Sequence, residues 1–332
     1  MKHINWSDFI KRNIALLAVV MMLIVGTVLY GNTFLNYRRN LMNVLFSASM
    51  LGIMGIGVNL CFLIGARDLS VAAVAAAASM FSAFASPYGL AASLAVGLIC
   101  GALFGCLSGV VVAKFKVQPF IATLGVQLAA RGTALLVNNE LSKEIDTSAH
   151  LLKAMGNANL FGLLPVSAAI FICLIVVFTI VLGYTSFGRA VYAIGGNEEA
   201  AAMMGVSVDK VKILIFMMSG MTAGLTGVIL SGHISAGQPT SFVGWEMTIM
   251  AAIVIGGTST TGGVGKIYGI FFGVLFLQLI TNIINLNGTI SPYWKDVITG
   301  GILLGAVLLQ RITDIRSEMA ATMVEPSGDM AK

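Results

Sequence analysis

Ionisable residues inside otherwise apolar stretches are the first candidates for chemistry in this sequence. Arg131 lies within an apolar run, and Arg67 and Asp68 interrupt another run in "IGARDLSV". A charged side chain at the centre of a membrane helix costs roughly 2.5–3.5 kcal/mol on insertion scales, so such residues usually have a specific role. We expect Arg131 either to bond backbone carbonyl groups at a helix contact or to line a path. We expect Arg67 and Asp68 to pair at a bend rather than to form a proton relay.

Catalytic motifs are absent from the sequence. The histidines, His3, His150 and His233, cannot be combined with a serine and an acid into a credible triad. The string "GGTSTTGGVGKI" superficially resembles a phosphate-binding loop, but the GxxxxGK[ST] pattern would need glycine at Thr260 and a hydroxyl at Ile267. We therefore expect a bend made of small residues here, and no enzyme activity, metal site or cofactor in the chain.

The composition is that of a membrane protein. Of the 332 residues, 58% are hydrophobic and 10% are charged, and the mean hydropathy is +0.94. Uncharged apolar stretches recur that are long enough to cross about 30 Å of hydrocarbon at 1.5 Å per residue. The net charge of +5 comes from basic residues scattered at the ends of these stretches, which argues against nucleic-acid binding. The four cysteines lie inside apolar runs without CxxC spacing, so we expect reduced packing residues.

The elements that position these residues are predicted to be membrane-spanning helices. Apolar runs and turns predict an all-α, polytopic bundle of about ten transmembrane helices. We expect a transmembrane domain over residues 1–311 and a cytoplasmic polar tail over residues 312–332. The expected spans lie at residues 14–31, 41–64, 69–86, 89–113, 118–137, 162–183, 213–231, 247–260, 267–286 and 290–309.

Lysine and arginine residues near the span ends predict the orientation, because they stay on the cytoplasmic side. With the N-terminus inside, most basic residues fall in inner segments, so both termini are predicted to be cytoplasmic. The outside keeps one sizeable loop at residues 138–160. The first span follows Lys11 and Arg12 without a small-residue cleavage site, so we expect it to be retained. The outer segments are left with Arg38, Arg39, Lys143, Lys153 and Lys295.

Glycine spacing predicts one tight helix contact. The fourth span contains "GLICGALFGCLSG", which places Gly97, Gly101, Gly105 and Gly109 at four-residue spacing on one helix face. Helices in lipid associate through close backbone contact, which small residues permit. This seam could join two copies of the chain or neighbouring helices of one copy, and we favour neighbouring helices.

A polar stretch punctuated by glycine, "YAIGGNEEAAAMMGVSVDKVK", separates two long apolar runs. Asn197 is a good N-cap, Glu198 and Glu199 suit the first turn of a helix, and Gly205 can end it. A helix of about seven residues spans roughly 10 Å and is marginal alone in water, so a partner or the flanking spans must hold it. The basic residues place it in the cytoplasm, where composition alone allows a simple connector equally well.

Several long motifs resemble those of one family, the permease subunits of ribose-type, or simple-sugar, ABC importers. The matching stretches are "TSFGRAVYAIGGNEEAAAMMGVSVDKVK", "FIATLGVQLAARGTAL" and "AAIVIGGTSTTGGVG", and the resemblance covers nearly the whole chain. They resemble the family's cytoplasmic loop, fifth span and eighth span. The chain departs from the family at Arg67, where an uncharged residue is usual, and at Ala72, where glycine is usual.

The resemblance implies a permease of the bacterial inner membrane that receives a simple sugar from an extracytoplasmic binding protein. It also implies pairing with a second permease, identical or homologous, and ATP hydrolysis by a separate cytoplasmic ATPase subunit. The helix within residues 197–205 then resembles a coupling helix, which docks on the ATPase and transmits its closure to the spans. The alternatives are an ion-driven secondary transporter of a small polar solute, which also uses glycine-broken helices, and a membrane scaffold.

Two groups of functional residues are expected from these motifs. The residues expected to couple to the ATPase are Arg189, Gly195, Gly196, Asn197, Glu198, Glu199, Ala200, Ala201 and Gly205. The residues expected in the pathway or its gate are Asp68, Ser70, Arg131, Gly256 and Gly257. The sugar itself stays open between pentoses, hexoses and furanose forms, because the binding protein usually holds the primary specificity in such systems.

Overall fold

The computed structural model describes residues 6–305, 307–308 and 312, and helices dominate this part of the chain. Among the described residues, eight helices are long and apolar enough to cross a membrane. The prediction of an all-α, polytopic membrane protein is therefore confirmed. The predicted polar tail lies outside the described residues except for residue 312.

The long helices follow the expected spans closely, and shorter helices lie between them. The long helices are α1 (Trp6–Leu35), α2 (Met42–Leu63), α3 (Val71–Ala85), α4 (Leu90–Lys114), α5 (Pro119–Leu136), α7 (Val166–Tyr184), α10 (Val208–Ile234) and α12 (Gly269–Asn287). The shorter ones are the π-helix η1 (Tyr37–Leu41), the 3₁₀-helix η2 (Ser86–Tyr88), α6 (His150–Asn157), α8 (Ser186–Gly196), α9 (Glu198–Met203) and α11 (Trp245–Ile255).

Two of the expected spans differ from the prediction or extend beyond the described residues. The eighth was expected at residues 247–260, but α11 has only 11 residues. At 1.5 Å per residue it covers about 16 Å, roughly half of the hydrocarbon thickness. Gly256 and Gly257 follow the helix end, and a loop over residues 258–265 replaces its expected last turn. The tenth expected span is helical from residue 294 to 305, and its end lies partly outside the described residues.

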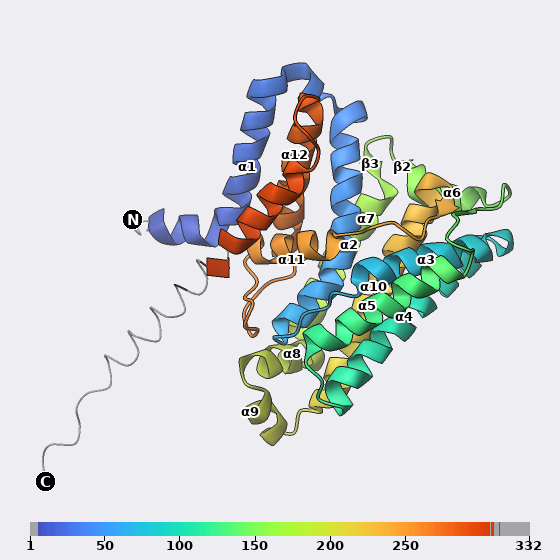
Figure 1. The fold of residues 1–332 in the computed structure, drawn as a ribbon. Helices are drawn as coiled ribbons and strands as arrows, with labels where there is room; N and C mark the ends of the chain where they lie inside the picture. Colours follow the sequence, from blue (N-terminus) through green and yellow to red (C-terminus); the bar gives the residue numbers. More distant parts are fainter. Residues whose placement is uncertain (1–5, 306, 309–311, 313–332) are drawn as a thin grey trace, which may run out of the picture.

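The helices form two groups that share α2 (Figure 1). α1, α2 and α12 stand side by side, and α3, α4, α5 and α10 form an inclined group next to them. α2 contacts helices of both groups together with α7 and α11. Most of its residues are buried, which is typical of a helix that is apolar all round and occupies the core.

The predicted glycine seam is confirmed, and it joins α4 to α10 within one chain. A side-chain carbon on Gly101 would overlap the backbone of Gly220, and one on Gly105 would overlap the backbone of Phe216. Gly224 of α10 faces Gly97 in the same way. The small residues of both helices therefore allow their backbones to touch, which is how helices pack closely in lipid.

Two short antiparallel strand pairs brace the loops at one end of the molecule. β1 (Lys143–Glu144) pairs with β4 (Ala236–Gly237), with Lys143 opposite Gly237. β2 (Asn159–Leu160) pairs with β3 (Leu164–Pro165). α6 and the β2–β3 pair lie at the end of the molecule opposite α9 (Figure 1). The chain thus has two differently built ends, one with the braced loops and one with α8 and α9.

Candidate functional site

The short helix predicted in the polar stretch forms as α9. The side-chain oxygen of Asn197 accepts a hydrogen bond from the backbone N–H of Ala200 at 2.9 Å, which is the predicted N-cap. After the helix, Gly205 has a φ of +85°, a conformation that glycine adopts readily, and its N–H donates to the carbonyl of Ala202 at 3.0 Å. The predicted start and stop are confirmed, and the helix has six residues instead of about seven.

A second helix, α8, precedes α9 and was not predicted. Its N-cap is Thr185, whose side-chain oxygen accepts a hydrogen bond from the N–H of Gly188 at 3.3 Å. Val191 and Ile194, three residues apart, turn inward and are buried, whereas Arg189 is exposed. The threonine cap and this apolar spacing are the signals in the sequence that could have revealed α8. Residues 186–204, which comprise α8, α9 and the C-cap residue Met204, are called the α8–α9 knob below.

The base of the knob is packed onto the end of α2 and the loop that follows α11. A side-chain carbon on Gly195 would overlap the carbonyl oxygen of Leu63, the last residue of α2, and the backbone of Gly263. The N–H of Gly263 in turn donates to that carbonyl oxygen at 2.9 Å. The Tyr192 hydroxyl donates to the carbonyl of Gly265 at 3.0 Å, and burial raises the pKa of this phenol. The knob, the end of α2 and the loop after α11 therefore meet through backbone atoms.

Ala201, one of the residues expected to couple to the ATPase, does not lie on the outward face of the knob. Ala201 is fully buried, so it holds α9 against the protein. Met203 and Met204 are 85% and 72% exposed, and Glu199 and Ala200 are exposed beside them. The helical phase that turns Ala201 inward depends on packing against the rest of the chain, which the polar stretch alone does not reveal. The two methionines were therefore missed.

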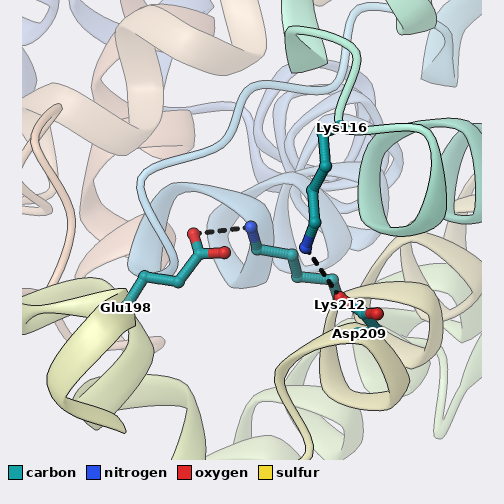
Figure 2. A network of polar contacts seen from close by, with 4 residues as sticks. All are labelled: Lys116, Glu198, Asp209 and Lys212. Atoms are coloured by element: carbon teal, nitrogen blue, oxygen red, sulfur yellow. Dashed lines mark hydrogen bonds and ion pairs between the residues drawn. The ribbon is translucent and has the colours of Figure 1, made fainter. Parts of the chain in front are cut away.

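Two ion pairs tie the knob region to its surroundings (Figure 2). Lys212 of α10 contacts Glu198 of α9 at 2.6 Å, and Lys116, in the turn before α5, contacts Asp209 of α10 at 3.0 Å. The second pair is largely exposed, and ion pairs of that kind contribute about 0–1 kcal/mol. Lys212 is only 12% exposed, so its contact with Glu198 serves chiefly to fix the position of α9 on α10.

Asp68 and Ser70, predicted for the pathway, lie together in a buried hydrogen-bond cluster. Oδ1 of Asp68 accepts hydrogen bonds from the N–H and the hydroxyl of Ser70 at 2.9 and 2.6 Å. Oδ2 accepts one from the hydroxyl of Ser219 in α10 at 2.7 Å. The expected pair between Arg67 and Asp68 is wrong, because Arg67 is exposed at the bend while Asp68 turns into the protein. The cluster joins the connection between α2 and α3 to α10.

The other predicted pathway residues lie elsewhere. Arg131 of α5 donates from Nη1 to the carbonyl oxygens of Pro239 and Ser241 at 2.6 and 2.9 Å, which confirms the expected bonding to backbone carbonyls. Gly256 packs against Gly269 at the end of α11. Gly257 has open space around it and a φ of +88°. The structure thus brings Asp68 and Ser70 together but not these three residues.

The candidate spans define the class of protein as a polytopic membrane protein. The chain belongs to the family described as "Branched-chain amino acid transport system / permease component", which matches residues 40–307. The family and the candidate spans make it a multi-pass protein of the bacterial inner membrane.

Curated relatives refine the family assignment. The L-arabinose transport system permease protein AraH of Escherichia coli K12 is 36% identical over 300 residues, which is 89% of each chain. The ribose import permease protein RbsC of the same organism is 35% identical over 305 residues, 89% of this chain and 92% of the relative. The probable ABC transporter permease protein YphD is 36% identical over 324 residues, 96% of each. No solved structure matches the chain. The predicted resemblance to sugar ABC permeases is confirmed.

Proposed function

We propose that this chain is the permease subunit of an ATP-binding cassette importer that carries a simple sugar. Relatives named for L-arabinose and ribose transport support the sugar class. The observation that carries the proposal is the α8–α9 knob, because its base is packed on the end of α2 and the loop after α11 while its tip exposes Met203 and Met204. Flexible methionine side chains fit an apolar groove on a partner well. A separate ATPase subunit is the proposed partner.

The packing suggests how movement of the ATPase would reach the spans. Displacement of the knob would push on the carbonyl of Leu63 and on Gly263 through Gly195. From the end of α2, the bonds between Asp68 and Ser219 lead on to α10. Closure of the ATPase would therefore bias the gate between two states through packed backbone, as a shift of one rigid body against another.

The remaining partners follow from this orientation of the chain. The knob faces the cytoplasm, so the braced loops with α6 face the outside and receive the sugar-binding protein. A second permease, identical or homologous, completes the pathway. L-arabinose and D-ribose are the first sugars to test, since these are the sugars in the names of the relatives.

Isolation of the tagged chain from its native membrane tests the proposal. A stoichiometric ATPase subunit is expected to co-purify and to hydrolyse ATP faster when the sugar-loaded binding protein is added. The variant Met203→Asp is expected to lose the ATPase, whereas Gly183→Ala on α7, which adds a methyl group in open space away from the knob, is expected to keep it. A chain that purifies from native membranes as an active transporter without any ATPase would contradict the proposal.

A further inference from the structure

α5 differs from the other poorly buried spans in its polarity. Among the candidate spans in the described part of the chain, α5 is the least apolar and α7 the most apolar, yet both leave most of their surface unburied. A helix surrounded by lipid needs an apolar surface, as α7 has. Part of the open surface of α5 is therefore expected to meet something other than hydrocarbon.

Two polar residues of α5, Gln127 and Arg131, lie on one edge of the helix, and Gln127 bonds to α11. Gln127 and Arg131 are four residues apart and share a helix face. Nε2 of Gln127 donates to Oε1 of Glu246, in the first turn of α11, at 3.1 Å. Arg131 lies near enough to Glu246 to interact with it electrostatically. All three side chains are partly buried, so the contact between α5 and α11 holds a polar cluster.

Gln127 and Arg131 lie inside a candidate span. Arg131 is about 18 Å along α5 from its first residue at 1.5 Å per residue, in the second half of a span of 18 residues. Charged residues inside a span usually face a pathway or a partner group rather than lipid. The carbonyl bonds of Arg131 to Pro239 and Ser241 fix its guanidinium and the loop before α11 to each other.

One acceptor of the cluster is unused. Within the described part of the chain, Oε2 of Glu246 is buried and has no hydrogen-bond partner. A buried polar atom without a partner loses its hydration and gains nothing in return, so a ligand that can donate a hydrogen bond to it is stabilised there. A sugar hydroxyl is such a donor, and the same sugar can accept hydrogen bonds from Arg131 or Gln127.

The charges and the neighbouring rings indicate the kind of solute. The carboxylate of Glu246 and the guanidinium of Arg131 compensate each other, which favours a neutral solute over an anion or a cation. Trp245, next to Glu246, packs edge-on against Phe242 with ring centroids 5.0 Å apart. Aromatic surface with a few well-placed polar groups is typical of small-molecule sites.

We propose that Gln127, Arg131 and Glu246 form a site at the contact between α5 and α11 that binds the hydroxyl groups of a neutral sugar during its passage. The site rests on the proposed function. It places the path along the polar edge of α5, on the side of the membrane away from the knob. Glu246 is the acceptor, Gln127 positions its carboxylate, and Arg131 donates from a fixed place.

The test uses the complete complex, with its ATPase and binding protein, in proteoliposomes supplied with radiolabelled L-arabinose or D-ribose. Glu246→Gln and Gln127→Ala are expected to lower sugar uptake about tenfold, which corresponds to about 1.4 kcal/mol at 25 °C. ATP hydrolysis stimulated by the binding protein is expected to stay within about twofold of the unmodified complex. Leu128→Ala, at the exposed neighbour of Gln127, is the matched control and is expected to transport normally.

Labelling of an introduced thiol distinguishes a binding site from a purely structural cluster, because only a binding site is protected from the reagent by sugar. Gln127→Cys is expected to react with a membrane-impermeant maleimide above the background of the native cysteines, and saturating sugar is expected to slow the reaction. Val176→Cys, on the exposed face of α7, is expected to stay unlabelled. Equal labelling of the Gln127→Cys variant with and without sugar would overturn the site.

The failure of the site and the failure of the proposed function have different signatures. If the unmodified complex transports sugar but Glu246→Gln and Gln127→Ala behave like Leu128→Ala, the site is wrong and the function stands. If both variants lose ATP hydrolysis together with uptake, the cluster is structural and the site is again wrong. If the unmodified complex moves no sugar with ATP, the proposed function itself fails.

Discussion

Gly195 lies so close to the carbonyl oxygen of Leu63 that any side-chain carbon at position 195 would overlap it. The same carbonyl oxygen accepts a hydrogen bond from the N–H of Gly263 at 2.9 Å. One backbone oxygen therefore connects the end of α8, the end of α2 and the loop that follows α11. Close-packed interiors have low compressibility and transmit strain, so this contact is suited to carry motion from the knob into the spans.

Gly195→Val is expected to uncouple the permease. The valine side chain must push the knob away from Leu63 and Gly263, and overpacking of this kind costs about 1–3 kcal/mol. If the coupling free energy falls by that amount, transport is expected to be slower by roughly 5–150-fold. The measurement is sugar uptake per ATP hydrolysed in the reconstituted complex. Gly183→Ala on α7, where an added side-chain carbon meets nothing within 4 Å, is the control and should transport normally. Normal uptake by Gly195→Val would show that the contact carries no coupling.

Substitutions on the two faces of α9 are expected to fail for different reasons. Met203→Asp places a charge on the exposed tip, so it should weaken ATPase binding while leaving the permease as stable as before. Ala201→Asp buries an unpaired charge under α9 and should lower the thermal stability of the permease itself. Pull-down of the ATPase and thermal unfolding in detergent separate the two effects. Equal stability losses in both variants would contradict the inward orientation of Ala201.

Ser219→Ala is expected to destabilise the chain through Asp68. The substitution removes the hydroxyl that donates to Oδ2 at 2.7 Å and leaves a buried carboxylate oxygen without that donor, at a cost of about 1–3 kcal/mol. Thr226→Val on the same helix is the control, because its hydroxyl bonds to the carbonyl of Thr222 within the helix and its loss should cost less. The free energy of unfolding of both variants is measured by SDS titration in mixed detergent micelles. An equal effect of the two variants would argue against the Asp68 cluster as a link to α10.

Gly105→Leu is expected to prevent close packing of α4 on α10. The side chain would collide with the backbone of Phe216 and Met217, which cannot move aside as a side chain can, so the cost is about 3 kcal/mol or more. A side-chain carbon added at Gly183 on α7 would meet nothing within 4 Å, so Gly183→Leu is expected to fold normally. The yield of monodisperse protein after extraction from membranes compares them. A normal yield for Gly105→Leu would place the seam elsewhere.

Features encoded by local spacing could be predicted from the sequence. The seam on α4 depends on glycines four residues apart. The start of α9 depends on the side-chain oxygen of Asn197, and its end depends on the backbone freedom of Gly205; both act within one helical turn. Both were predicted correctly because the residues that cause them are neighbours in the sequence. The helix partner of the seam was not named, since the glycines of α10 become its complement only in the folded chain.

Features that depend on distant segments could not be predicted. Asp68 was expected to pair with its neighbour Arg67, but its partner in α10, Ser219, lies 151 residues away. Likewise, the contact of Gly195 with Leu63 and the burial of Ala201 follow from how the knob rests on the spans. The eighth span was predicted too long. The sequence pattern included Gly256 and Gly257 in the helix, but in the structure α11 ends before them.

Transport by purified components tests most directly whether this chain is a gate worked by a separate ATPase through the α8–α9 knob. Proteoliposomes would hold either the permease alone or the permease with its ATPase, and radiolabelled L-arabinose and D-ribose would be offered on their binding protein. Accumulation of sugar against its gradient is predicted only when the ATPase and ATP are both present, and Gly195→Val should lower it roughly 5–150-fold. Accumulation by the permease alone under an ion gradient, without nucleotide, would contradict the proposed mechanism.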